Sequence, residues 1–300
     1  MNSKKKTKKQ TSQLPVAVVY AVTLLIAVAV FGTIGYFAVR NFLPENKPQD
    51  ELAEENSVNY SIKDDSITLY TVSDSYDTLH SVVLAAFKPS TQNIIIIPLT
   101  PYIDCNGQTF AEIYMSQGIA AATDAVAKTL DITIDRYMTM SDTTLSEVIN
   151  IMGTSIVSLV DPIVIPDSAT GGTVSYQKGA RIAVDGDMAA TLITYPNYAS
   201  GYSSNMKMSG EIAATAINNF FKQPKTAKAN IDTIFRKEYN DANTNMTEDD
   251  YNLTKSALVY VIENSTMPSY SLTPTGIWPE PQRFVVDESF IHQLEGYLES

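Results

Sequence analysis

A run of 25 residues, Pro15 to Val39, contains no charged side chain and consists mostly of Val, Ala, Leu, Ile and Phe. As an α-helix it would be roughly 37 Å long, which exceeds the hydrocarbon thickness of a bilayer, about 30 Å. Lipid offers the backbone no hydrogen-bond partners, so a helix is the form expected of such a segment. We therefore predict one transmembrane helix over residues 14–43, preceded by a short tail over residues 1–13.

A cleaved signal peptide is the competing interpretation of this run. Ala27-Val28-Ala29 has small residues at the spacing of a cleavage site, and the chain begins with a basic stretch. That candidate site lies inside the apolar run, however, and ten further residues of the run follow it. Because the apolar region of a signal peptide usually measures about 7 to 15 residues, an uncleaved anchor is the favoured interpretation.

The charges on the two sides of the run predict its orientation. Five lysines precede it, whereas the stretch from Pro44 to Asn59 is mainly acidic and polar. The side rich in lysine is expected to stay in the cytoplasm. We therefore expect a single-pass protein of the cell membrane with a cytoplasmic N-terminus, a solvated linker at residues 44–60 and an extracytoplasmic domain at residues 61–300.

The part of the chain that begins at Pro44 is strongly acidic. It contains all 33 acidic residues but only 15 of the 21 basic ones, because six basic residues come earlier, so its net charge is −18. Nucleic acids and anionic lipid surfaces both attract basic segments, so this charge argues against either as a partner. Cys105 is the only cysteine, which excludes an intrachain disulfide and is typical of a Gram-positive surface.

Beyond residue 60, segments with the period of a strand alternate with segments that have the period of a helix. Two apolar runs, Leu79–Phe87 and Asn93–Leu99, are separated by a short break and predict a buried antiparallel hairpin. Thr109, Asp142 and Thr247 are the expected N-caps of three helices. Further helices are expected at 186–194, 209–221, 227–238 and 289–298, further strands at 66–71, 132–140, 155–160 and 284–286, and a loop at 167–179. This order predicts an α/β/α sandwich with a central mixed sheet.

Sequence motifs for common chemistries are absent. The chain has two histidines, His80 and His292, which lie far apart, and Cys105 has no histidine near it in sequence. No phosphate-binding loop, Gly-x-Ser-x-Gly motif or zinc spacing occurs. The residues alone therefore predict no catalytic centre.

A series of short segments nevertheless resembles a known family. Ser75-Tyr76-Asp77-Thr78 leads into an apolar strand, Ile97-Pro98-Leu99-Thr100 ends the next one, and Asp142–Gly153 forms a helix that ends at glycine. Val184-Asp185-Gly186 opens a later helix, and Asn243–Thr247 precedes another. In this order, over most of residues 66–298, the segments resemble the LytR-CpsA-Psr family of cell-envelope proteins.

That resemblance implies a fold and an activity. Members of the family are single-span proteins with an extracytoplasmic α/β/α domain. They transfer glycopolymers from a polyprenyl pyrophosphate carrier to peptidoglycan or another acceptor, and they hold the pyrophosphate with several arginines and a magnesium ion. Arginine suits this task because its guanidinium donates several hydrogen bonds in one plane and stays charged, and the metal neutralises charge that develops in the transfer.

At the positions that correspond to the arginines of the family, this chain has other residues. Ser75 occupies the first position, and Leu99-Thr100 replaces an arginine–aspartate pair. Two later arginine motifs fall near Ile193–Tyr195 and Met206–Gly210, where only Lys207 is basic. The four arginines that follow Pro44 lie off these positions: Arg136, Arg181, Arg236 and Arg283.

Two aspartates are the candidate metal ligands. Asp77 occupies the position of a magnesium-binding aspartate in the family, and Asp74 could serve as a second carboxylate ligand. The alternative interpretation is that both are turn residues whose side chains bond to their own backbone.

Two functions remain open at this point. The favoured one is a membrane-anchored envelope protein that has lost catalysis, a pseudoenzyme that binds a polyprenyl lipid or a cell-wall polymer as a scaffold and needs no cofactor. The alternative is an active glycopolymer transferase, a phosphotransferase of the family type, that uses Mg²⁺. In that case, relocated cations would bind the phosphates, and the candidates are Lys88, Lys178, Arg181 and Lys207. An unrelated α/β ectodomain is the third interpretation.

Overall fold

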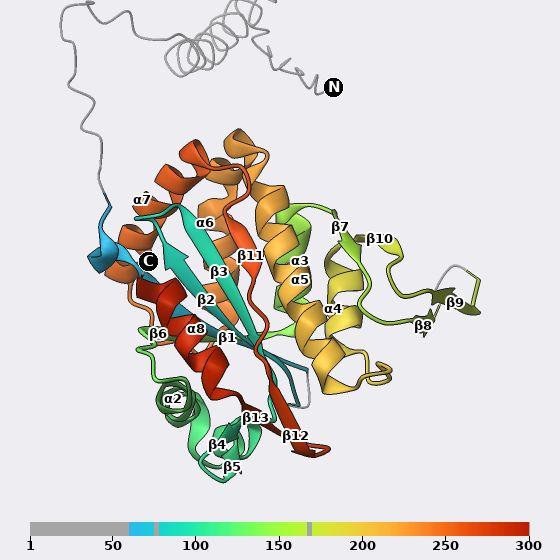
Figure 1. Ribbon diagram of the computed structural model, residues 1–300. Helices are drawn as coiled ribbons and strands as arrows, with labels where there is room; N and C mark the ends of the chain where they lie inside the picture. The colour runs from blue at the N-terminus through green and yellow to red at the C-terminus, as the bar shows by residue number, and fades with distance from the viewer. Residues whose placement is uncertain (1–59, 75–77, 167–169, 300) are drawn as a thin grey trace, which may run out of the picture. The chain divides into compact units, whose positions relative to one another are not determined.

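Figure 1 shows the protein as a computed structural model, which describes residues 60–74, 78–166 and 170–299. The predicted tail, the predicted transmembrane helix and all of the linker except Tyr60 lie outside these residues. Within the described ranges, no helix combines the length and the apolar composition that crossing a membrane requires.

A mixed sheet of five strands, in the order β11-β3-β2-β1-β6, forms the centre of the described domain. The antiparallel strands are β1 (Ser66–Ser73), β2 (Leu79–Lys88) and β3 (Asn93–Leu99). β6 (Arg136–Ser141) pairs in parallel with β1, and β11 (Ser269–Ser271) pairs in parallel with β3. The predicted hairpin and the predicted mixed sheet are both confirmed.

Helices cover both faces of this sheet (Figure 1). Because side chains alternate along a strand, neighbouring residues of β3 enter different layers, and Ile95 packs with the first group of helices while Ile96 packs with the second. The first group contains α2 (Phe110–Leu130) and α8 (Glu288–Glu299). The second contains α3 (Asp142–Met152), α5 (Tyr202–Phe221), α6 (Pro224–Asp241) and α7 (Glu248–Asn264). The described residues therefore form three layers, helix, sheet and helix.

A smaller hydrophobic cluster lies beside the second layer. It joins α4 (Gly186–Thr194) and parts of α3 and α5 to two short strand pairs. These pairs are β7 (Ser155–Ser158) with β10 (Arg181–Val184), and β8 (Ile163–Pro166) with β9 (Thr173–Tyr176). The predicted loop at 167–179 is therefore wrong at β9. Its four residues alternate between exposed and half-buried positions, which left no apolar run to detect.

Three further strand pieces complete the chain. β4 (Asp104–Cys105) and β5 (Gln108–Thr109) precede α2, and β12 (Gly276–Glu280) pairs with β13 (Arg283–Val286). A short 3₁₀ turn, η1 (Ile62–Asp64), precedes β1.

Hydrogen bonds at the helix ends explain where the helices start. Thr109 and Thr247 are N-caps, as predicted, and each forms a capping box, with Glu112 and Asp250 respectively. The cap of α3 is Ser141, whose hydroxyl accepts the backbone N–H of Thr144 at 3.0 Å. The prediction of Asp142 as this cap was wrong by one residue.

Candidate functional site

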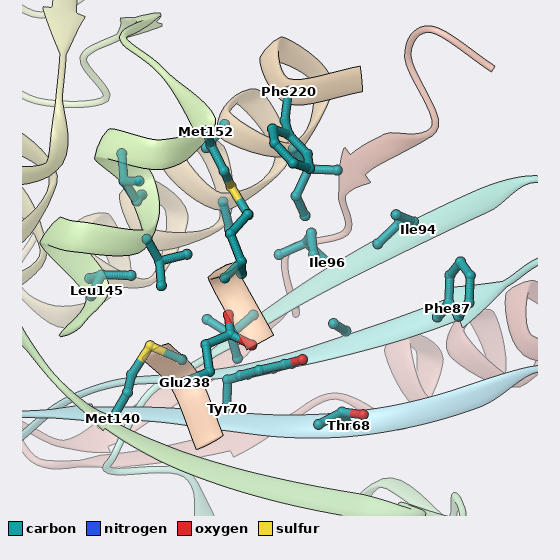
Figure 2. A pocket seen from close by; sticks show the side chains of 18 of the residues that line it. Thr68, Tyr70, Phe87, Ile94, Ile96, Met140, Leu145, Met152, Phe220 and Glu238 are labelled. Carbon is teal, nitrogen blue, oxygen red and sulfur yellow. The ribbon is translucent and has the colours of Figure 1, made fainter. Parts of the chain in front are cut away.

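A cavity of about 290 Å³ lies between the sheet and its second helical layer. Its floor is formed by alternate residues of β1, β2 and β3, and its walls come from α3, α5, α6 and α7. Figure 2 shows aliphatic and aromatic side chains around the space, among them Met140, Leu145, Met152, Phe87 and Phe220. A concave, mostly apolar site of this size is typical of a ligand pocket.

Small residues on facing elements explain why the two layers leave this space. On the floor, Ser66, Ser81 and Ala85 stand where larger side chains would reach the helices. Across the cavity, α5 presents Ala213 and Ala216. Protein interiors are otherwise packed as densely as organic crystals, so small residues facing one another leave a void.

Three polar residues, Tyr70, Arg136 and Glu238, line the middle and one side of the cavity and are called here the polar cluster. Tyr70 and Arg136 come from the neighbouring strands β1 and β6, and Glu238 comes from α6. Figure 2 shows the Glu238 carboxylate directed into the cavity beside Tyr70. Tyr70 and Glu238 separate the part lined by Met140 and Leu145 from the part lined by Phe87 and Ile94 (Figure 2).

Burial controls the ionisation of this cluster. Burial raises the pKa of the Glu238 carboxyl to about 7, because the apolar walls cannot solvate its charged form. Burial also raises the pKa of the Tyr70 hydroxyl, the Glu238 carboxylate raises it further, and the Arg136 guanidinium opposes the rise. Both charged groups are therefore close enough to act on the Tyr70 hydroxyl.

Arg136 is held in place by one side of its guanidinium. Its Nη2 donates to the Asp250 carboxylate at 2.9 Å, while its Nη1 is buried and has no hydrogen-bond partner among the described residues. Asp250 also accepts the backbone N–H of Thr247 at 2.9 Å, and the Thr247 backbone and hydroxyl, together with Arg136, lower the pKa of Asp250 to about 2. Lys255, the other lysine or arginine of the lining, donates to Asp232 at 2.6 Å.

The opposite part of the cavity lies at the C-terminal end of β1, where the family resemblance places the phosphate site. Val72 pairs there with Ser81 and with Met140, and Ile193 of α4 closes the wall. Ser209 contributes a buried hydroxyl. These described lining residues include no cation, so this part offers hydroxyls and apolar surface in place of arginine.

The first of the two predicted metal ligands, Asp74, directly follows β1. The Asp74 carboxylate accepts the backbone N–H of Thr78 at 2.9 Å, and its other oxygen lies 3.0 Å from Nε2 of His80. These are the contacts of a turn residue. Asp77 lies outside the described residues. In the part of the chain that the structure describes, no group of three or more His, Cys, Asp or Glu side chains could hold a metal ion.

Lys88, a predicted phosphate contact, points away from the cavity. It follows Phe87, which lines the cavity, so its side chain enters the opposite layer. There its Nζ donates to the backbone carbonyls of Tyr297 at 2.9 Å and Leu298 at 3.0 Å, and it lies 4.0 Å from the Asp65 carboxylate. Lys88 thus binds the C-terminal end of α8, where helix carbonyls attract a cation.

The other three predicted phosphate contacts are exposed and do not line the cavity. Lys178 lies between β9 and β10, and Arg181 lies on β10 opposite Ser158. Lys207 lies on the solvent side of α5, between the buried residues Met206 and Met208. The structure therefore does not bring the four predicted cations together at one site.

The polar cluster was missed by the sequence analysis, although the sequence contains a signal for part of it. Ile231, Ile234, Phe235 and Glu238 follow helical spacing and all line the cavity. A carboxylate on an apolar helix face is a signal of a buried functional group. Arg136 is likewise a charged residue within a predicted strand. Its partner Asp250 lies far away in the sequence, so the pair could not be predicted from sequence spacing.

Comparison with protein families identifies the chain. Residues 81–294 match the model of the LytR_cpsA_psr family. This protein belongs to that family. Among proteins with curated descriptions, none matches its sequence.

Solved structures share the fold of this family member. A protein of Eubacterium siraeum, described as a transcription regulator, has a TM-score of 0.70 and 17% identity, with 86% of this chain and 98% of that chain covered. TagV of B. subtilis has a TM-score of 0.60 and 16% identity, with 78% and 96% covered. TagT bound to LI-WTA has a TM-score of 0.55 and 16% identity, with 80% and 92% covered. At these identities the likeness shows the fold alone.

Proposed function

We propose that this protein is a non-catalytic envelope module of the LytR-CpsA-Psr family that binds a long apolar chain in the cavity. The observation that carries the proposal is the cavity itself, which is lined by apolar strands and helices. Among the described lining residues it has no cation at the end where the family resemblance places the phosphate site. The predicted membrane anchor and the position outside the membrane are part of this proposal. A bilayer would supply the lipid.

The contents of the cavity favour an apolar chain as ligand. Its walls bring together side chains that would pack against methyl and methylene groups, such as Met152, Phe220 and Ile96 (Figure 2). Burying apolar surface contributes roughly 25 cal/mol per Å², so an isoprenoid or acyl chain gains affinity from every carbon that it places there. The solved relative TagT bound to LI-WTA supports the proposal that this fold accommodates such ligands.

The lost arginines argue against transfer. A hydrogen bond to a charged group contributes about 1.5 to 3 kcal/mol, so losing several at the phosphate end would reduce the rate roughly 10³-fold or more. The described residues also do not fit a magnesium ion, because both oxygens of Asp74 already contact Thr78 and His80.

Blocking the cavity tests this proposal. In Ala213→Phe, a ring would enter the cavity from α5, whereas in Ala120→Phe the ring would lie on the exposed side of α2. The full chain, released from detergent micelles, would be examined by native mass spectrometry after incubation with a C20 isoprenoid alcohol. We expect wild type and Ala120→Phe to retain the lipid and Ala213→Phe to lose it. Equal retention by all three proteins would contradict the proposal.

The active transferase stays the second candidate. It would require phosphate contacts other than the four predicted ones, because those four do not meet at the cavity. A transfer assay distinguishes the two candidates.

A further inference from the structure

The polar cluster leaves hydrogen-bonding capacity inside an otherwise apolar cavity. Arg136 has a buried Nη1 without a partner, and no hydrogen bond or ion pair in the described residues involves the Glu238 carboxylate or the Tyr70 hydroxyl. A buried polar group without a partner is costly, and native proteins seldom keep one without a use. The buried Nη1 of Arg136, in the same cavity as the half-buried Glu238 carboxylate and Tyr70 hydroxyl, indicates that a ligand satisfies this cluster.

The charges around the polar cluster restrict the charge that the head group of the ligand can have. The Arg136 charge is already balanced by Asp250, and the Lys255 charge is balanced by Asp232. Glu238 is the charged lining residue without a counterion, so the cavity as a whole is neutral when Glu238 is protonated and negative when it is not. A pyrophosphate would bring further negative charge into this apolar space and find no free cation among the lining residues that the structure describes. An ammonium group would satisfy Glu238 but would be repelled by Arg136.

A hydroxyl satisfies both sides of the cluster. Its oxygen would accept a hydrogen bond from Arg136 Nη1, and its proton would be donated to the Tyr70 hydroxyl or to the Glu238 carboxylate. A hydroxyl also enters an apolar cavity without the solvation cost of a full charge. We propose that the polar cluster recognises the uncharged hydroxyl of a long-chain lipid alcohol whose chain occupies the apolar parts of the cavity.

This inference rests on the proposed lipid-binding function and specifies the head group. It also places that group in the middle of the cavity, beside Tyr70, and not at the C-terminal end of β1. The orientation of the bound lipid therefore differs from one in which a charged head group occupies the phosphate end.

A set of probes with the same chain and different head groups tests the inference. Native mass spectrometry of the full chain would compare retention of geranylgeraniol, geranylgeranyl pyrophosphate and geranylgeranyl amine. We expect wild type to retain the alcohol roughly 10-fold better than either charged probe. This factor corresponds to one well-placed hydrogen bond, and the alcohol also avoids the free-energy cost of burying a charge in the cavity.

Variants of the polar cluster separate recognition from folding. Glu238→Leu removes the acceptor while keeping a side chain of similar size, and Tyr70→Phe removes one hydroxyl. We expect both variants to bind the three lipids equally well, without a preference for the alcohol. Glu238→Gln should keep part of that preference. Glu211→Gln, which alters an exposed residue of α5, should behave as wild type. Far-ultraviolet circular dichroism would confirm that each variant is folded.

Two results would overturn the inference, and they differ from each other. If wild type and Glu238→Leu retain all three probes equally, or wild type prefers the pyrophosphate, the recognition of a hydroxyl is wrong while lipid binding stands. If wild type retains none of the probes, the proposed function fails together with the inference.

Discussion

At the scale of single residues, Glu238 makes the stability of the domain depend on pH. Its pKa of about 7 in the folded protein exceeds its ordinary value of 4.5. Well below pH 4.5 the Glu238 carboxyl is protonated in both the folded and the unfolded chain, so its ionisation does not change the free energy of unfolding. As the pH rises towards 7, the Glu238 carboxyl ionises in the unfolded chain before it ionises in the folded one. The free energy of unfolding therefore falls, by up to about 3 kcal/mol in total.

The matching experiment compares wild type with Glu238→Gln by denaturant unfolding at pH 5 and pH 8. Other groups titrate equally in both proteins, so the difference between them isolates Glu238. We expect Glu238→Gln to gain stability relative to wild type by about 3 kcal/mol at pH 8, but by only about 1 kcal/mol at pH 5. Parallel pH profiles for the two proteins would show that Glu238 is solvated.

The close approach of α3 explains why α4 begins with a glycine, Gly186. A Cβ at this position would lie 1.9 Å from the backbone oxygen of Ser146 in α3, so the two helices could not approach. Asp185 caps the same helix by accepting the Met188 N–H at 2.9 Å. Helix capping and helix packing thus explain why Asp185 and Gly186 occur in the segment Val184-Asp185-Gly186, which is part of the family resemblance.

Substituting two glycines by alanine tests this reason. Gly186→Ala should lower the free energy of unfolding by about 1 to 3 kcal/mol, the usual cost of overpacking. Gly296, in α8, has open space around its Cα, so Gly296→Ala should raise it by about 0.5 to 1 kcal/mol through helix propensity. Thermal unfolding of both variants checks the prediction, and a fall in stability of equal size in both would refute it.

The candidate site residues could be predicted only in part. Asp74, Lys88 and Lys207 were singled out by type and by their place in the family pattern, but type does not say which way a side chain points. Lys88 is one residue away from Phe87 and therefore lies on the other face of the sheet. Arg136 and Glu238 both line the cavity because β6 and α6 pack together, which a single sequence does not show.

At the scale of elements, Lys88 attaches the closing helix α8 to the sheet. Its buried ammonium donates to two carbonyls in the last turn of α8. Lys88→Met keeps the aliphatic stem but leaves these carbonyls without their donor, which should cost about 1 to 3 kcal/mol. Hydrogen exchange of the α8 amides should accelerate selectively.

The matched control is Lys207→Met, which alters an exposed lysine on α5. We expect it to leave stability within about 0.5 kcal/mol of wild type, as exposed substitutions usually do. Unchanged exchange of α8 in Lys88→Met would show that α8 is held by its apolar contacts alone.

Long elements could be predicted from the sequence, and short ones could not. The hairpin of β2 and β3 and the helices α2, α3 and α7 were predicted because apolar periodicity and capping residues agree over many residues. β11 was missed because its three residues become a strand only by pairing with Ile94–Ile96 of β3. The segment Asn243–Asn245 likewise lies along β6 through bonds such as Thr244 Oγ1 to the Tyr137 carbonyl at 2.6 Å.

At the scale of the whole molecule, the sheet and both helical layers follow the fold of the family. Apolar patterning determines the layers, so the α/β/α sandwich could be predicted without any site residue. Function depends on a few side chains placed on that fold, and these can change while the fold is kept. The chain from Pro44 onward has a net charge of −18, which agrees with a cavity whose described lining residues include no free cation.

A transfer assay tests the central claim, binding without catalysis, most directly. The full chain would be incubated with Mg²⁺, a lipid-linked glycopolymer and peptidoglycan, with an active family enzyme run in parallel, and polymer attached to peptidoglycan would be measured. We expect no transfer above background for wild type and the same result for Asp77→Ala. Transfer by wild type that disappears in Asp77→Ala would contradict the claim and establish the active transferase.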